Sequence, residues 1–310
     1  PSEAHPARLL FTHEQARALA RTGARVEALD LDPPDGAPDR FPRDGIVVHR
    51  VAVPRRWRGP PVALAERLRA VRRTIIERVR AGGFDLVLLS FLAHKYAPFW
   101  GAFRASGARV AITAHGVDAM AKEEGWPVRW TKTALLLGAD RVFAVSAATA
   151  ELVRGLLPPG TRGRVLEVPN GVDREKLDPA LCVPRSVHRV ELGWPEDARV
   201  ILSVGNLVPR KGFDRLVDAM AGLARRGRAA RLVIVGRGPE RAALEARARA
   251  LGVEDKVELV GEVWSDARLA AAFAACDAFA LASRTLHDPP AMEGFGVVYA
   301  EASYLGRPVV

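Results

Sequence analysis

Short apolar runs that alternate with amphipathic helical runs set the strongest limit on what this chain can fold into. The strand-like runs include "FDLVLLSF" (84–91), "RVILSVG" (199–205) and "RLVIVG" (231–236), and none of them alternates strictly between apolar and polar residues. Such runs are typical of strands buried on both faces of a parallel sheet, whereas the helical runs between them keep one apolar face. The sequence therefore predicts an α/β protein built from doubly wound parallel sheets.

This alternation occurs twice, and a polar stretch containing prolines separates the two series. At 310 residues the chain exceeds the usual size of one hydrophobic core. We therefore expect two Rossmann-like domains facing a cleft, over residues 1–190 and 191–310. The chain starts at Pro1 and ends on "GRPVV", so we expect the first strand and the C-terminal end of the fold to be missing. Ligands of open parallel sheets bind beyond the carboxyl ends of the strands, which makes the loops there the first candidates for a site.

Two such loops in the second half have the chemistry of a phosphate site. Gly205 ends a strand, and Arg210 and Lys211 stand just before the next helical run. A glycine lets backbone amides approach a ligand closely, and adjacent cations at a helix start suit a diphosphate. Gly236 ends the following strand in "VGRGPE", which lacks the third glycine of the dinucleotide fingerprint. The pattern therefore gives little support to NAD and favours another ligand with a diphosphate.

The segment "MEGFGVVYAE" (292–301) places two carboxylates, Glu293 and Glu301, on either side of a glycine turn. Gly294 and Gly296 free the backbone where a helix begins, so the first amides of that helix would point at an anion. A carboxylate at Glu293 would repel the same phosphate, so we expect it to accept hydrogen bonds from sugar hydroxyls. Glu301 is two helical turns further on and can reach a second pair of hydroxyls. The layout fits a nucleotide-sugar.

Four segments carry a resemblance to a known family: "VGNLVPRKGFD", "LVIVGRGPE", "VELVGEV" and "EGFGVVYAEASYLGRPVV". In order and spacing they resemble the donor-binding domain of retaining glycosyltransferases of family 4, which have the GT-B fold. Glu293 and Glu301 match the E-x7-E motif of that family. "TAHGVD" (113–118) resembles the H-G-x-D segment of its acceptor domain. The resemblance covers essentially the whole chain and suggests the bacterial type that builds envelope or exopolysaccharide sugars.

The resemblance implies a role for each matching residue. Arg210 and Lys211 would hold the donor diphosphate, Glu293 would contact the transferred sugar, and Glu301 would bind the ribose. His115 would reach the sugar near the scissile bond. The implied catalytic set is His115, Glu293, Arg210 and Lys211. The implied donor-binding residues are Gly205, Arg210, Lys211, Gly236, Gly261, Glu262, Val263, Glu293, Gly294, Phe295, Gly296, Val297 and Glu301.

The N-terminal half contains the candidate residues for binding the acceptor. His94 follows a strand and Asp118 lies in the "TAHGVD" segment, so both are acceptor-side candidates. Arg55, Arg56 and Arg58 surround a Trp before an amphipathic helical run, which suits contact with anionic lipid. With the resemblance, this predicts transfer of a hexose to a lipid-linked or polysaccharide acceptor by an enzyme in peripheral contact with a membrane.

Other functions fit parts of the sequence. The formal charge of +10 suits a nucleic-acid binder, but the aromatic share of 6% offers few stacking platforms and no recognition motif occurs, so we expect no nucleic-acid partner. An epimerase or phosphorylase of the same fold, or a non-catalytic nucleotide-binding subunit, remains an alternative.

The sequence predicts neither a metal ion nor a cofactor. No His, Cys or carboxylate cluster has metal-ligand spacing, and the UDP- or GDP-linked sugar would be a substrate. UDP-hexoses and GDP-mannose both fit the motifs. Two cysteines are too few for a disulfide scaffold, and no apolar run approaches about 18 residues. We therefore expect a cytoplasmic protein, associated with the inner face of the membrane.

Overall fold

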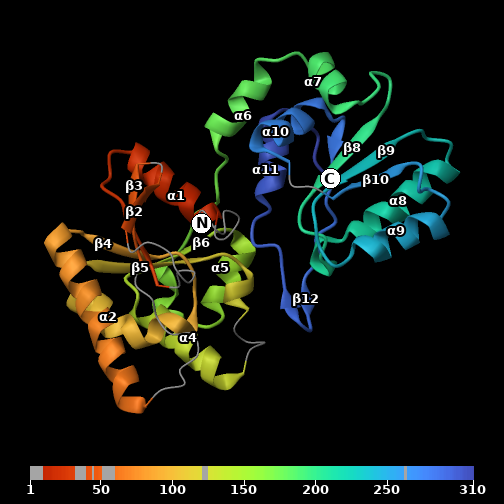
Figure 1. The fold of residues 1–310 in the computed structure, drawn as a ribbon. Helices are drawn as coiled ribbons and strands as arrows, with labels where there is room; N and C mark the ends of the chain where they lie inside the picture. The colour runs from red at the N-terminus through yellow and green to blue at the C-terminus, as the bar shows by residue number, and fades with distance from the viewer. Residues whose placement is uncertain (1–9, 32–39, 44, 51–59, 121–124, 262–263) are drawn as a thin grey trace. The chain divides into compact units, whose positions relative to one another are not determined.

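The structure, a computed structural model, describes residues 10–31, 40–43, 45–50, 60–120, 125–261 and 264–310. The chain forms two compact units (Figure 1). The N-terminal unit consists of Pro1–Ala114, Gly125–Phe143 and Arg154–Leu166. The C-terminal unit consists of His115–Glu124, Ala144–Val153 and Glu167–Val310.

A four-stranded sheet with strand order β4-β5-β6-β7 lies mainly in the N-terminal unit. Its strands are β4 (Leu86–Leu89), β5 (Arg109–Ala114), β6 (Arg141–Ala144) and β7 (Val165–Glu167). β4 and β5 pair in parallel, as the apolar runs predict. Val110, Ile112 and Val142 are completely buried, because helices cover a sheet whose strands carry apolar residues on both faces. The helical segments of the N-terminal unit that accompany this sheet are α2 (Pro61–Gly82), η1 (His94–Phe99), α3 (Trp100–Ala105), α4 (Trp126–Gly138) and η4 (Pro159–Arg164), whereas η2 (Val117–Ala119) and almost all of α5 (Ala147–Arg154) belong to the C-terminal unit.

A second, smaller sheet of the N-terminal unit has mixed strand directions. It has the order β1-β3-β2 and follows α1 (Leu10–Arg21). β1 (Glu27–Asp30) pairs in parallel with β3 (Ile46–Arg50), whereas β2 (Arg40–Arg43) pairs with β3 in antiparallel fashion. Gly45, at φ 78°, lies in the tight turn between β2 and β3. A turn this short can only return the chain antiparallel, which explains the change of direction.

The C-terminal unit contains a parallel sheet with strand order β10-β9-β8-β11. Its strands are β8 (Val200–Val204), β9 (Arg231–Val235), β10 (Val257–Val260) and β11 (Ala278–Phe279). Val309 adds an isolated parallel bridge to Phe279 beyond β11. A short antiparallel pair, β12 (Leu286–His287) and β13 (Pro290–Ala291), follows β11 and carries the chain to the last helix.

Helices cover both faces of this sheet, as a doubly wound fold requires. In Figure 1, α8 and α9 lie together on one side of the strands, and α10 and α11 lie on the other. The helical segments of this part of the chain are α6 (Arg174–Leu181), α7 (Arg185–Leu192), η5 (Pro209–Lys211), α8 (Phe213–Arg225), α9 (Arg241–Ala250), α10 (Asp266–Ala275) and α11 (Val297–Tyr304). Leu202, Val233 and Phe279 are completely buried in the core between these layers.

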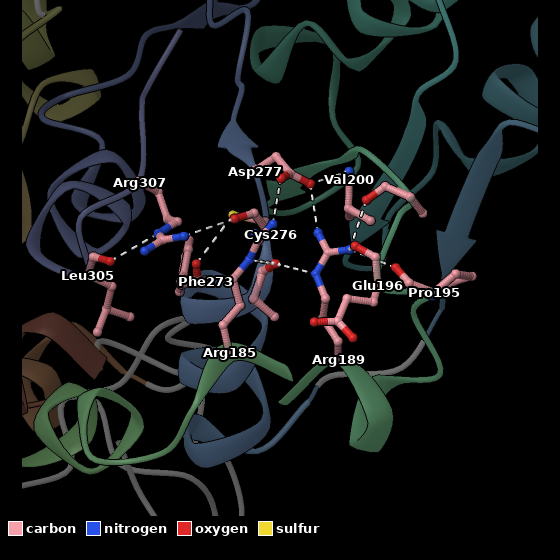
Figure 2. A network of polar contacts seen from close by, with 12 residues as sticks. Arg185, Arg189, Pro195, Glu196, Val200, Phe273, Cys276, Asp277, Leu305 and Arg307 are labelled. Carbon is pink, nitrogen blue, oxygen red and sulfur yellow. Dashed lines mark hydrogen bonds and ion pairs between the residues drawn. The ribbon is translucent and has the colours of Figure 1, made fainter. Parts of the chain in front are cut away.

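A polar network ties α7 to the amino ends of β8 and β11 (Figure 2). Asp277 accepts hydrogen bonds from the Val200 amide at 2.7 Å and from Arg189 Nη2 at 2.7 Å. Arg185 Nη2 donates to the other carboxylate oxygen at 2.5 Å. The Arg189 guanidinium is only 2% exposed and also donates to the carbonyls of Pro195, Glu196, Ala198 and Ala275. Each nitrogen of this buried guanidinium has an acceptor, which offsets the cost of burying its charge, and the network joins these elements at the edge opposite to the carboxyl ends of the strands.

Candidate functional site

The loops after β8 and β9 pack so closely that residue 236 must be a glycine. The Gly205 amide donates to the Val235 carbonyl at 3.0 Å. A Cβ atom on Gly236 would lie 1.9 Å from the Gly205 carbonyl oxygen. Any larger residue at Gly236 would therefore push the two loops apart. The structure brings these two predicted donor-binding residues together at the carboxyl edge of the sheet.

The loop after β10 joins the same edge through arginine side chains. Arg237 Nε donates to the Gly261 carbonyl, and Arg241 Nη2 donates to the Leu259 carbonyl at 3.1 Å. A Cβ on Gly261 would lie 2.5 Å from Arg241 Nη1, so a side chain there would displace this guanidinium. The predicted base-framing residues Glu262 and Val263 lie outside the described residues.

Arg210 and Lys211 lie on the short η5 turn that follows β8. Gly212 ends this turn at φ 67°, and a Cβ there would lie 1.9 Å from the Ala282 carbonyl oxygen. The Arg210 carbonyl accepts from the Arg284 amide at 2.8 Å, and Arg284 Nη1 donates to Asp214 at 2.9 Å. The turn is thus fastened to the segment after β11. Arg284 belongs to none of the sequence motifs, although its position after a neighbouring strand is a signal that could have indicated it.

Arg210 and Lys211 meet Glu293 in an ion triad. Arg210 Nη1 lies 2.9 Å from Glu293 Oε2, and Lys211 Nζ lies 2.5 Å from the same oxygen. The side chains of Arg210, Lys211 and Glu293 are 28%, 10% and 21% exposed, so water screens these contacts only partly. The triad keeps one net positive charge. The sequence assigned the cations and the acid to different parts of a ligand and did not predict their pairing.

The Lys211 stem explains why its ammonium is held so firmly. A Cβ on Gly205 would lie 3.3 Å from Lys211 Cε, so the stem runs over the face of that glycine. The lysine is therefore positioned by packing along its hydrocarbon chain and by its pairing with Glu293. A cation fixed in this way is preorganised for an anion that arrives from outside.

Helix α11 begins at the glycine turn next to the triad. Gly296 has φ 77°, and a Cβ there would lie 2.6 Å from the Tyr299 ring. The Tyr299 hydroxyl donates to the Leu281 carbonyl, and burial raises the pKa of this phenol. Tyr299 thus anchors the helix on the β11 side of the sheet. Phe295, Val297 and Glu301 are half-buried residues of the turn and the helix, with Glu301 two turns along from the triad.

Asp118 organises the loop that carries His115. The His115 amide donates to Asp118 Oδ1 at 2.8 Å, and the Ala119 amide donates to the Gly116 carbonyl at 2.8 Å. This loop belongs to the C-terminal unit, where a Cβ on Gly294 would lie 1.7 Å from the His115 carbonyl oxygen. The structure therefore places the His115 backbone against the turn that follows Glu293. His94 is an exposed residue at the start of η1 in the N-terminal unit.

No group of three or more His, Cys, Asp or Glu side chains with a geometry suited to a metal ion occurs among the described residues. In the same part of the chain, no helix combines the length and the apolar character needed to cross a bilayer.

The model for the glycosyl transferase 4-like domain matches residues 10–171, and the model for glycosyl transferases group 1 matches residues 184–310. The chain belongs to the family 4-like glycosyltransferases. A GDP-mannose-dependent alpha-(1-6)-phosphatidylinositol monomannoside mannosyltransferase of Mycobacterium tuberculosis H37Rv is 34% identical over 211 residues, which is 66% of this chain and 52% of that protein. The enzyme of the same description from Mycolicibacterium smegmatis is 36% identical over 67% of this chain and 53% of its own length. This glycosyltransferase chain spans about half the length of the curated relatives it matches.

Solved structures show the fold. Sucrose-phosphate synthase from Thermosynechococcus elongatus superposes with a TM-score of 0.72 at 22% identity, covering 97% of this chain and 74% of that one. Anabaena HepE in complex with UDP and glucose gives a TM-score of 0.64 at 22% identity, covering 86% and 67%. The glycosyltransferase therefore has the GT-B fold that the sequence predicts.

Proposed function

We propose that this glycosyltransferase moves a hexose from a nucleotide-sugar to a lipid-linked or polysaccharide acceptor, with retention of the anomeric configuration. The observation that carries the proposal is the triad of Arg210, Lys211 and Glu293 at the carboxyl edge of a parallel sheet. A net positive charge at that edge suits a diphosphate, and the neighbouring carboxylate suits sugar hydroxyls. Glu301, on α11, is assigned to the ribose hydroxyls.

In the proposed reaction the bond between the anomeric carbon and the diphosphate oxygen breaks. The acceptor hydroxyl oxygen forms the new glycosidic bond, and its proton passes to the departing diphosphate. Negative charge builds on the diphosphate as the bond breaks, and Arg210 and Lys211 stabilise it without needing to reorganise. Two fixed cations supply the charge that a metal ion would otherwise supply, so we propose a metal-independent transfer without a cofactor. His115 is proposed to act beside the sugar.

GDP-mannose is the donor we propose to test first. The relatives that are 34% and 36% identical to this chain are described as GDP-mannose-dependent and as acting on a phosphatidylinositol mannoside. The structures with UDP share only 22% identity and support the fold alone. An epimerase of the same fold would bind the same donors, but it would not need an acceptor. A product that contains both sugar and acceptor distinguishes transfer from epimerisation.

Melting temperatures test whether the site takes a nucleotide. At about 100 times the dissociation constant, GDP or UDP should add about 2.7 kcal/mol to the stability of the unit that binds it. That corresponds to a rise of about 5–10 °C for a unit of this size. Oligonucleotides that supply the same concentration of phosphate charge as the GDP or UDP should give no such rise in melting temperature. A rise with oligonucleotides and none with GDP or UDP would favour the nucleic-acid binder over the transferase.

We propose that helix α4 contributes to the membrane contact. Trp126 and Trp130 are 79% and 69% exposed, lie one turn apart on this helix, and have the exposed Arg129 beside them. Indole rings and cations on one exposed face suit the interface of an anionic bilayer. The loop of Arg55, Arg56 and Arg58, which the sequence assigns to the same contact, lies outside the described residues. A cytoplasmic enzyme on the inner face of a membrane is part of this proposal.

Vesicle co-sedimentation tests this contact. Replacing both Trp126 and Trp130 by Ser should lower the fraction bound to phosphatidylinositol-containing vesicles at least several-fold, because two interfacial anchors are lost. Val190→Ser is the matched control, since Val190 is an 80% exposed apolar residue on α7. Equal binding by the double variant and the control would reject α4 as the membrane contact.

A further inference from the structure

The triad has a property that the sugar-binding role of Glu293 does not explain. The carboxylate contacts both cations that the proposed function assigns to the diphosphate, and both contacts end on the same oxygen, Oε2. Glu293 therefore pairs with the same groups that a diphosphate would use. We infer that Glu293 is an internal counter-ion that competes with the donor diphosphate and is displaced when the donor binds. This inference rests on the proposed function.

Burial explains why the two cations need a counter-ion. The Lys211 side chain is 10% exposed, and its stem lies over Gly205. A cation removed from water in this way is costly unless an anion accompanies it. Glu293 supplies that anion and keeps both cations in place before the donor arrives. As a consequence, Glu293 already neutralises part of the positive charge of Arg210 and Lys211 before a diphosphate binds.

Repulsion explains why the counter-ion has to leave. A phosphate oxygen that reaches Arg210 and Lys211 would stand within a few ångströms of the Glu293 carboxylate, in a partly desolvated place where like charges repel strongly. Glu293 lies next to Gly294 and shortly before Gly296, which has φ 77°. A Cβ at Gly296 would lie 3.6 Å from Glu293 Cγ, so this glycine leaves room beside the Glu293 side chain for rotation about its own bonds. The carboxylate can therefore exchange its cations for the hydroxyls of the sugar.

The exchange also runs in reverse and gives Glu293 a part in product release. After transfer, the nucleoside diphosphate has no sugar to occupy the carboxylate. Glu293 then returns to Arg210 and Lys211 and competes with the product for them. The same side chain thus favours the donor, which offers it hydroxyls, over the product, which does not.

Titration calorimetry with GDP and UDP on the full-length protein tests this inference. Glu293→Gln keeps the shape of the side chain and removes the charge. It should bind the nucleoside diphosphate about tenfold more tightly than the wild type, a gain of about 1.4 kcal/mol. Most of the change should lie in a slower dissociation rate, measured by stopped flow. The ligand-free variant should melt at a lower temperature than the wild type, and saturating nucleotide should close that gap.

Glu258→Gln is the matched control, because it removes the same charge from a surface pair with Arg231 at 2.8 Å. The control should bind nucleotide as the wild type does. If the wild type binds and Glu293→Gln binds equally or more weakly, the counter-ion role is wrong while the donor site stands. An equal gain in both variants would mean that net charge alone is responsible, and would also overturn the inference. No binding by the wild type and both variants would reject the donor site and this inference together.

Discussion

Replacing Lys211 by Met is expected to slow sugar transfer about 100–1000-fold, which is the usual cost of removing one preorganised group that stabilises developing charge. Met keeps a hydrocarbon stem that can lie over Gly205 and removes only the ammonium. The loss should fall on kcat, because the charge on the leaving diphosphate is greatest in the transition state. Steady-state kinetics with a turned-over donor measure it.

The control for this variant is Lys256→Met, which removes a lysine paired with Asp255 at 3.0 Å on the surface. It should leave kcat within about twofold of the wild type, since exposed pairs contribute little. If Lys211→Met kept kcat within about threefold of the wild type, Lys211 would not stabilise the leaving diphosphate as we propose. A loss confined to KM would instead assign Lys211 to ground-state binding.

Replacing Asp277 by Ala is expected to destabilise the C-terminal unit by about 3 kcal/mol, because it leaves the charge of the buried Arg189 without its carboxylate; the Asp277 side chain is itself 37% exposed, which keeps the loss at the low end for such pairs. The Arg189 guanidinium, 2% exposed, would lose its carboxylate partner, and the Val200 amide would lose its acceptor. The melting temperature should fall by about 6–12 °C. Nucleotide affinity of the folded protein should not change, because Asp277 lies at the opposite edge of the sheet from the triad.

Because the pKa of Asp277 is lowered in the folded protein, we expect the free energy of unfolding to depend on pH. Burial alone would raise the pKa of Asp277, but the Val200 amide and the Arg185 side chain outweigh it and lower the pKa below 3.8. A carboxyl group with a lowered folded-state pKa stabilises the protein at pH values above its unfolded pKa. That stability is lost as the pH falls from about 4 through the folded-state pKa. Asp277→Ala should therefore lose less stability than the wild type over this acid range.

Asp255→Ala is the matched control for Asp277→Ala, because Asp255 is a 70% exposed partner in a surface pair. It should change the free energy of unfolding by less than about 0.5 kcal/mol. Denaturant titrations of both variants provide the comparison. A loss in Asp277→Ala no larger than in Asp255→Ala would show that the network in Figure 2 is dispensable.

The sequence predicted those parts of the fold that depend on local patterns. Mostly apolar runs place β8 and β9 correctly, because strands in the interior of a covered parallel sheet are buried on both faces, and they also locate the edge strand β10, which carries the partly exposed Glu258. Gly205 was predicted to let a ligand approach the backbone; in the structure a Cβ there would meet the Lys211 stem, whereas a Cβ on Gly236 would meet the Gly205 carbonyl oxygen. The antiparallel β2 was not predicted, since its sequence "RFPR" lacks an apolar run.

Contacts between distant segments could not be predicted in the same way. Arg189 has the sequence context of an exposed helix residue, yet it is buried because four carbonyls and Asp277 surround it. The triad is a similar case, since 82 residues separate Lys211 from Glu293. Each of these pairings follows from how helices and loops meet around the sheet, which no single motif records.

The central claim is that the triad serves a nucleotide-sugar transferase, and a donor screen on the full-length protein tests it most directly. UDP-glucose, UDP-galactose, UDP-N-acetylglucosamine and GDP-mannose would each be offered with EDTA present, beside a Glu293→Ala variant. We predict turnover of one donor, GDP-mannose first, that survives EDTA and collapses in the variant. Absence of turnover with every donor, together with no binding of UDP or GDP, would contradict the assignment of this site.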